Sequence, residues 1–170
     1  LGVPVHDSDA AVHALYDPKS EAFSCIKTAF PPYIYTKLYK KDFFRRILSI
    51  KKDEMGKIIF NNPQKRAELE HILHPFVQKS QDLFIAQCRR MGQVICGLDI
   101  PLLFETGADR RVDVTICISA PASMQADRVL NRPGMSVEKF ESILARQMPD
   151  AEKCRRADYV VHSSLGRAHM

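Results

Sequence analysis

Three aspartates lie where short apolar runs end. Asp7 and Asp9 come directly after the run Val3–His6, and Asp99 closes a second run, Val94–Leu98. A carboxylate at the end of a strand can take a proton from a substrate hydroxyl, or hold Mg²⁺ through water. The alternative for the first pair is that one aspartate caps the following helix. The two roles can coexist, one for each residue.

Two arginines could stabilise the charge of a transferring phosphoryl group. Arg128 and Arg132 are four residues apart, so a continuous helix would place them on one face. Pro133-Gly134 then releases the chain into a loop, and Arg146 comes on the final turn of the next expected helix, 136–147. Planar guanidinium groups beside a hinge suit the charge that spreads over a phosphoryl group. A solvated basic face is the alternative.

The histidines and cysteines give weaker signals. His71 and His74 are three residues apart, a spacing that can bind metal, but no third ligand lies nearby in the sequence. His74 is expected to cap a helix that begins at Pro75, or to contact a ligand. The five cysteines are odd in number, widely spread and never arranged as C-x-x-C. They indicate free thiols in a reducing, cytoplasmic compartment rather than a disulfide framework or a zinc site.

Length and charge limit the class of protein. The 170 residues suffice for one domain with a small subdomain. No apolar run approaches the ~20 residues that cross a bilayer, and no signal-peptide pattern is present. The net charge of +5 indicates an anionic partner, which could be nucleic acid, anionic lipid or a phosphorylated metabolite.

Helical periodicity predicts the elements between the first two aspartate-bearing runs. A first helix is expected over Asp9–Tyr16, with Ser8 or Asp9 as its cap. The residues from Tyr33 to Lys52 read as a basic amphipathic helix, whose charged side could meet nucleic acid or a membrane or simply face solvent. A third block begins with Asn62 as cap and Pro63 at the first helical position. Pro75 interrupts that block, which predicts two helices or one kinked helix.

Short apolar runs predict the strands that position the aspartates. They alternate with the helices, which is typical of a parallel sheet in an α/β fold. The expected strands are Val3–His6, Val94–Leu98, Val112–Ser119 and Tyr159–Val161. Open α/β sheets bind ligands beyond the carboxyl ends of their strands. Asp7, Asp9, Asp99 and Pro121 are therefore expected to converge on one edge.

An ordered series of strings resembles one family, the dephospho-CoA kinases. The strings are LGVPVHDSD, IIFNNPQKRAELEHILHP, DIPLLFETG, QADRVLNR, ILARQMP and ADYVVHSS, and they span nearly the whole chain. The resemblance implies a three-layer P-loop kinase fold, with a parallel sheet flanked by helices. It also implies a nucleotide-kinase core over 1–17 and 93–170, with a lid at about 128–147. A helical subdomain over 18–92 would receive the acceptor.

The same resemblance implies a reaction and residue roles. The family is a phosphotransferase that moves the γ-phosphate of ATP, bound with Mg²⁺, to the ribose 3′-hydroxyl of dephospho-CoA, the final step of coenzyme A synthesis. Asp9 would be the general base or orienting carboxylate, and Arg128 would act with it in catalysis. Nucleotide and lid contacts would come from Arg128, Arg132 and Arg146. Acceptor contacts would come from Asp7, Phe60, His74, Pro75, Asp99, Pro101 and Leu102.

One motif of the family is not found in these residues. The pattern G-x-x-x-x-G-K-[ST], whose Ser or Thr binds Mg²⁺, does not occur. We expect this motif just upstream of Leu1. We therefore expect the 170 residues alone not to turn over ATP, and we assign no metal ligand among them. Two alternatives remain: another P-loop small-molecule kinase, or a non-catalytic binding module on a degenerate kinase scaffold. The expected partners are dephospho-CoA and ATP, without nucleic acid or membrane, and the oligomeric state stays open.

Overall fold

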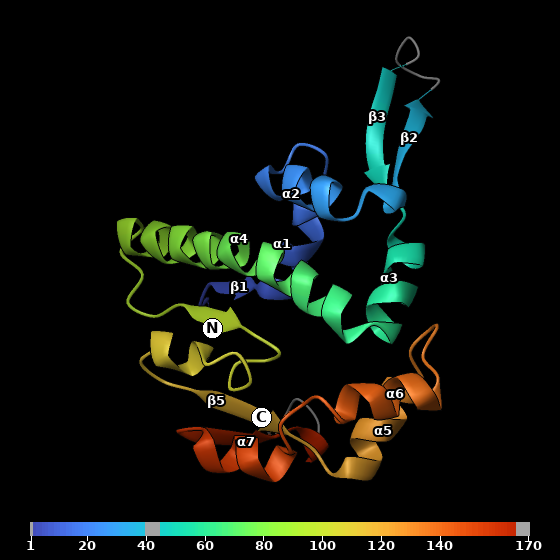
Figure 1. Ribbon diagram of the computed structural model, residues 1–170. Coiled ribbons are helices and arrows are strands. Elements are labelled where there is room, and N and C mark those ends of the chain that lie inside the picture. The colour runs from blue at the N-terminus through green and yellow to red at the C-terminus, as the bar shows by residue number, and fades with distance from the viewer. Residues whose placement is uncertain (1, 40–44, 166–170) are drawn as a thin grey trace. The chain divides into compact units, whose positions relative to one another are not determined.

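The computed structural model describes residues 2–39 and 45–165 (Figure 1). By its internal contacts the chain divides into two compact units, Leu1–Pro101 and Leu102–Met170. Each unit carries one pair of parallel strands and several helices. Within the described residues, no helix is both long enough and apolar enough to cross a membrane.

The parallel pair of the first unit brings two aspartates into register. Strand β1 (Val5–Asp7) pairs with β4 (Gly97–Asp99), and Asp7 is the partner of Asp99 at the carboxyl end of both. The predicted run Val94–Leu98 is therefore only partly a strand. Val94 is 97% exposed, because the ladder starts where Gly97 donates its N–H to the Pro4 carbonyl at 2.9 Å.

Helices surround this pair in the first unit. They are α1 (Ser8–Leu15), α2 (Glu21–Ala29), the 3₁₀ turn η1 (Pro31–Tyr33), α3 (Lys52–Asn61) and α4 (Pro63–Arg90). The predicted start of α4 is confirmed, because the Asn62 side chain accepts a hydrogen bond from the Lys65 N–H at 3.0 Å and Pro63 opens the helix.

The core of the first unit lies among α2, α3, α4 and the end of β3. Phe30 and Ile26 are its largest fully buried side chains. The buried cluster consists of Ala22, Phe23, Ile26, Phe30, Ile50, Met55, Leu69 and Leu73. Val12 and Leu15 of α1 pack against it, which holds α1 on the same body as α4.

A single helix runs through Pro75. The sequence left open two helices or one kinked helix, and the structure gives one, α4, of 28 residues. Its ribbon changes direction near the middle (Figure 1), as a ring without an N–H favours. His74 lies inside this helix, so the prediction that it caps a helix beginning at Pro75 is wrong.

The segment predicted as a basic helix over 33–52 is mostly a β-hairpin. Strands β2 (Ile34–Tyr39) and β3 (Arg45–Ile50) pair antiparallel, with Ile34 opposite Ile50 (Figure 1). The error has a simple cause, since Ile34 and Leu38 are four residues apart, a spacing that suits one helix face and one strand face equally. Residues 40–44, which carried part of that prediction, lie outside the described residues.

The second unit is built on its own parallel pair. Strand β5 (Ile116–Ser119) pairs with β6 (Tyr159–His162). The helical elements are η2 (Ala108–Arg111), α5 (Ala122–Leu130), α6 (Val137–Leu144), α7 (Asp150–Arg156) and the 3₁₀ turn η3 (Ser163–Leu165). The parallel pairs and their flanking helices confirm the predicted α/β class, although the run 112–119 forms a strand only over its second half.

Candidate active site

The junction between β1 and α1 separates the roles of its two aspartates. The Asp7 side chain accepts a hydrogen bond from the Ala10 N–H at 2.8 Å and is the N-cap of α1. The prediction that Ser8 or Asp9 caps this helix is therefore wrong. Asp9 sits exposed in the first turn, where the partial positive charge of the helix N-terminus stabilises a carboxylate.

Two side-chain hydrogen bonds fix this junction to α4. The buried Ser8 hydroxyl accepts from the Gln81 amide at 3.1 Å, and His6 Nε2 lies 3.0 Å from the Ser80 hydroxyl. Both bonds join residues more than 70 positions apart, so no local motif could reveal them. They hold Asp9 on a rigid support, which a positioned acid or base requires.

The structure brings together some of the predicted strand-end residues. Asp7 and Asp99 are register partners, and both side chains are exposed. Pro101 follows two residues after β4, and Leu102 is 38% exposed at the start of the second unit. Pro121 also belongs to the second unit, where it is the N-cap residue of α5.

Arg128 has an organised environment on α5. Its guanidinium donates to the Ser163 hydroxyl at 3.0 Å and to the Ser163 carbonyl at 2.9 Å. The same hydroxyl donates to the Ser119 carbonyl at the end of β5. The fork of Arg128 is thereby oriented over the carboxyl ends of β5 and β6, where α/β proteins place ligands.

The other two arginines lie outside regular helix. Helix α5 ends at Leu130, so the expected single helix face for Arg128 and Arg132 is wrong. Arg146 comes two residues after the end of α6. Pro133 disfavours helical backbone at Arg132, and Gly134 takes a positive φ of 76° in the turn that follows, between α5 and α6.

Glu105, in the string DIPLLFETG, fastens two segments of the second unit. It accepts from the Met148 N–H at 2.8 Å and pairs with Lys153 at 3.1 Å, with side chains 16% and 18% exposed. Burial acts to raise the pKa of Glu105, but the Met148 N–H and the Lys153 ammonium lower the pKa overall. Glu105 is therefore a structural anchor.

The string ADYVV also has a structural role. Asp158 accepts from both the N–H and the hydroxyl of Thr115, at 2.8 and 2.7 Å, and its own N–H donates to that hydroxyl. These hydrogen bonds lower the pKa of Asp158. They set the register in which β5 and β6 begin.

The expected acceptor residues of the helical part are spread along two helices. Phe60 is half-buried on α3, and its carbonyl accepts from the Arg66 guanidinium at 2.7 Å. His74 and Pro75 are exposed on α4. The depression that the structure shows there, about 570 Å³ and open, does not include them; it is lined by Ser24, Cys25, Thr28, Ala29, Glu68 and Ile72.

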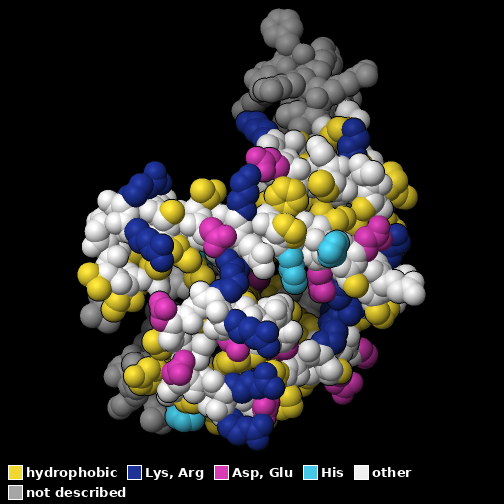
Figure 2. All heavy atoms as spheres, turned by 60° about the vertical axis from the view of Figure 1, so that its left-hand side comes forward, with side chains coloured by type: hydrophobic (Ala, Val, Ile, Leu, Met, Phe, Trp, Pro, Cys, Tyr) yellow, Lys and Arg dark blue, Asp and Glu magenta, His cyan; other side chains and the backbone are white. Residues whose placement is uncertain are grey.

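The excess of basic residues does not form one uninterrupted patch on the face in view. Figure 2 shows Lys and Arg side chains interspersed with acidic ones on this face. Several pair locally, as Lys65 does with Glu68 at 2.7 Å and Lys79 with Glu21 at 2.7 Å. On the face in view, the basic side chains are thus separate groups rather than a continuous surface.

Comparison with known proteins gives a consistent result. The family profile described as dephospho-CoA kinase matches residues 1–168. Dephospho-CoA kinases of Agrobacterium fabrum and Mesorhizobium japonicum are 46% and 41% identical to this chain; each alignment covers 97% of it, and 78% and 77% of the respective relative.

Solved structures agree. A crystal structure of a Thermus thermophilus protein matches with a TM-score of 0.70 at 28% identity, covering 99% of this chain and 78% of that one. A dephospho-CoA kinase from Campylobacter jejuni matches with a TM-score of 0.59 at 25% identity, covering 98% and 79%. The fold is thus the α/β fold of P-loop kinases. The chain belongs to the dephospho-CoA kinase family.

Proposed function

We propose that this protein transfers the γ-phosphate of ATP to the ribose 3′-hydroxyl of dephospho-CoA. Family membership over nearly the whole chain carries this proposal. Both substrates are polyphosphates, which fits the net charge of +5. Phosphoryl transfer depends chiefly on positioning and on charge stabilisation, so the residues of interest are a fixed carboxylate and oriented arginines.

Asp9 takes the role of base or orienting carboxylate for the acceptor hydroxyl. Asp7 is engaged as the cap of α1, whereas no cap role falls to Asp9. Hydrogen bonds of Ser8 and His6 fix the junction to α4, so the backbone that carries the Asp9 carboxylate is held in place. Accepting the proton of the 3′-hydroxyl makes its oxygen a better nucleophile.

Arg128 stabilises the charge on the transferring group. Its fork is already oriented by two acceptors of Ser163, which reduces the entropy lost when it turns to phosphate. Arg132 and Arg146 complete the nucleotide side, in the lid of about 128–147. The core in this proposal is 1–17 with 93–170.

The acceptor side is the helical segment 18–92. We assign acceptor contacts there to Phe60, His74 and Pro75. We assign further acceptor contacts to Asp7, Asp99, Pro101 and Leu102. The exposure of His74 and Pro75 on α4 supports this role, since an acceptor can reach them.

Magnesium would enter with ATP. Mg²⁺ prefers carboxylate and water oxygens, and the exposed side chains of Asp9 and Asp99 are donors of that kind, whereas Asp7 is partly engaged by Ala10. When bound, the ion neutralises phosphate charge. We assign no direct ligand among the described residues.

The decisive experiment is a product assay. The full-length protein is incubated with MgATP and dephospho-CoA, because the 170 residues alone are not expected to turn over ATP, and mass spectrometry follows the gain of one phosphoryl group. The matched control is 3′-deoxy dephospho-CoA, which should gain none. Phosphorylation of the deoxy compound would reject the assigned hydroxyl. If dephospho-CoA neither reacts nor raises the melting temperature of the protein, its assignment as the acceptor is rejected.

A further inference from the structure

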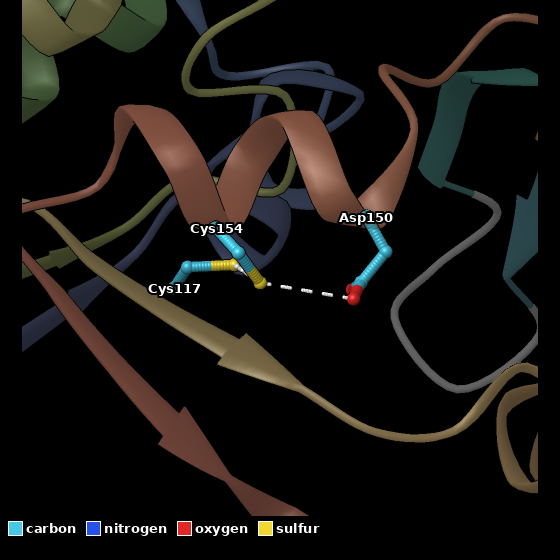
Figure 3. Close-up of side chains that lie close together, drawn as sticks. All are labelled: Cys117, Asp150 and Cys154. Atoms are coloured by element: carbon cyan, nitrogen blue, oxygen red, sulfur yellow. Dashed lines mark hydrogen bonds between the residues drawn. The ribbon is translucent and has the colours of Figure 1, made fainter.

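Two sulfurs and a carboxylate meet beneath α7, and none of the three belongs to a residue assigned to phosphoryl transfer. Cys154 and Asp150 come from α7 and Cys117 comes from β5, and their side chains point toward one another (Figure 3). Their ligand atoms all lie within 4.8 Å of one another. Cys117 is 8% exposed, while Cys154 and Asp150 are half-buried. This is the one group of three such side chains found among the described residues.

The distances fit the edges of a tetrahedron. The two sulfurs are 3.9 Å apart, and Cys154 Sγ is 3.7 Å from Asp150 Oδ2. Around a tetrahedral Zn²⁺, with Zn–S of about 2.3 Å and Zn–O of about 2.1 Å, two sulfurs lie about 3.8 Å apart and a sulfur and an oxygen about 3.6 Å apart. These two distances would change little around a shared ion. The third, between Cys117 Sγ and the Asp150 carboxylate, is within 4.8 Å and would become about 3.6 Å.

Neighbouring residues orient the carboxylate as the outer contacts of a metal site do. Asp150 Oδ2 accepts from the Ser119 hydroxyl at 2.7 Å, and Oδ1 accepts from the Gln125 amide at 3.2 Å. Such contacts fix the direction of a ligand and raise its affinity for metal.

We propose that Cys117, Cys154 and Asp150 form a binding site for a divalent cation of the Zn²⁺ class, with water as the fourth ligand. Two thiolates and a carboxylate suit a borderline-soft ion rather than Mg²⁺. The site joins α7 to β5, so its occupation fastens the helix that precedes β6.

Binding exchanges protons for metal. An S–metal bond replaces each thiol S–H bond that breaks, the proton goes to solvent, and nothing is oxidised or reduced. Burial, together with the nearby Cys154 thiol, raises the pKa of Cys117 to about 11. Metal binding competes with protons for the thiolates, so metal affinity falls as the pH is lowered.

Cobalt is the probe for this site. The metal-free chain, held reduced with a phosphine, is titrated with Co²⁺, whose tetrahedral thiolate complexes absorb in the visible and near-ultraviolet. We expect one equivalent to give both absorptions and Zn²⁺ to remove them by competition. Zn²⁺ should also raise the melting temperature. Absence of the thiolate absorption in the unsubstituted chain would overturn the proposal.

Substitutions assign the ligands. Cys154→Ser should abolish the thiolate absorption or weaken binding by at least roughly tenfold, and Ser119→Ala should weaken it by roughly tenfold to a hundredfold. Cys88 and Cys96 are the matched control, because their thiols also interact but no third ligand of the described residues joins them. Cys96→Ser should leave the spectrum unchanged. Circular dichroism checks that Cys154→Ser and Ser119→Ala are folded. If folded Cys154→Ser keeps the full thiolate absorption with Co²⁺, the site is refuted.

Discussion

At the residue scale, the two aspartates of the β1–α1 junction differ in whether they cap the helix. Asp7 accepts the Ala10 N–H, whereas Asp9 lies exposed one residue into the helix. An Asn at position 7 retains a cap oxygen and loses the charge, whereas an Asn at position 9 loses the proposed base. The pair therefore supplies its own control.

We predict that, in the full-length protein, Asp9→Asn lowers kcat by roughly hundredfold to ten-thousandfold, as expected for loss of a general base. Affinity for ATP should change little, because Asp9 is assigned to the acceptor hydroxyl. Steady-state kinetics and nucleotide titration of Asp9→Asn and Asp7→Asn measure both quantities. If ATP affinity falls as much as kcat in Asp9→Asn, the residue serves the nucleotide or its metal instead.

We also predict that Arg128→Lys slows phosphoryl transfer while the fold is kept. A Lys ammonium cannot reproduce a fork that bonds two acceptors, and one lost charge-assisted hydrogen bond costs about 1.5–3 kcal/mol. That corresponds to roughly a tenfold to hundredfold fall in kcat. Ser163→Ala, which leaves the Ser163 carbonyl as acceptor, should cost less. Unchanged kcat in Arg128→Lys would remove Arg128 from the site.

The sequence predicted the chemistry of a side chain only where that chemistry depended on residues nearby in the chain. The five cysteines are free thiols in the structure. Residue type and spacing made Asp9 and Arg128 candidates, and the family resemblance gave them their roles. The partners that fix these groups were not accessible, because Gln81 and Ser163 reach them from 73 and 35 positions away. Hydrogen bonds between residues so far apart in the chain produce no recognisable pattern in a single sequence.

At the element scale, the turn that carries Glu105 is a place where charge holds two segments together. The carboxylate joins the segment after β4 to the start of α7 through Met148 and Lys153. Its partners are poorly exposed, so this pair contributes more than an exposed one does.

We predict that Glu105→Gln lowers the free energy of unfolding by about 1–3 kcal/mol at neutral pH, since it loses the ion pair and keeps one acceptor. Because the pKa of Glu105 is lowered in the folded state, its contribution is complete above the pKa of the unfolded chain. That contribution is lost as the pH falls through the folded-state pKa. The difference between the two proteins should therefore shrink in acid. Denaturant melts at several pH values measure it.

Glu54→Gln is the matched control for this pair. Glu54 forms an exposed pair with Lys51, with side chains 57% and 40% exposed, and such pairs contribute about 0–1 kcal/mol. A Glu105→Gln variant no less stable than Glu54→Gln would contradict the anchoring role.

Helices were predicted correctly where capping residues marked their ends, and incorrectly where the hydrophobic spacing suited helix and strand equally. Asn62-Pro63 fixed the start of α4, because an amide cap and a ring at the first turn have few other uses. The even spacing of Ile34 and Leu38 fitted helix and strand alike, and pairing with β3 decided for strand. Strand lengths depended on the partner, so the exposed Val94 did not join β4.

At the scale of the whole molecule, the two units differ in how much apolar surface they bury. The first holds the cluster around Phe30 and Ile26, both almost fully buried. In the described part of the second unit, the buried hydrophobic residues are Cys117 and Ala120, while Ile118 on β5 is 69% exposed. Apolar burial is the main source of folding free energy, so local stability should be unequal.

We predict that backbone amides of α2 and of the middle of α4 exchange with deuterium most slowly, and that those of α5 and α6 exchange faster. The cause is that opening α2 exposes Phe23 and Ile26, whereas α5 and α6 contain no buried residue. Hydrogen exchange followed by mass spectrometry of peptides measures this order, with intrinsic rates from the unfolded chain as the reference. Equal protection of α2 and α5 would mean that the second unit is stabilised as strongly as the first, and that the buried cluster around Phe30 does not determine local stability. Zn²⁺ then gives a second comparison: if the Cys117 site exists, the ion should slow exchange in α7 and β5 without changing α2.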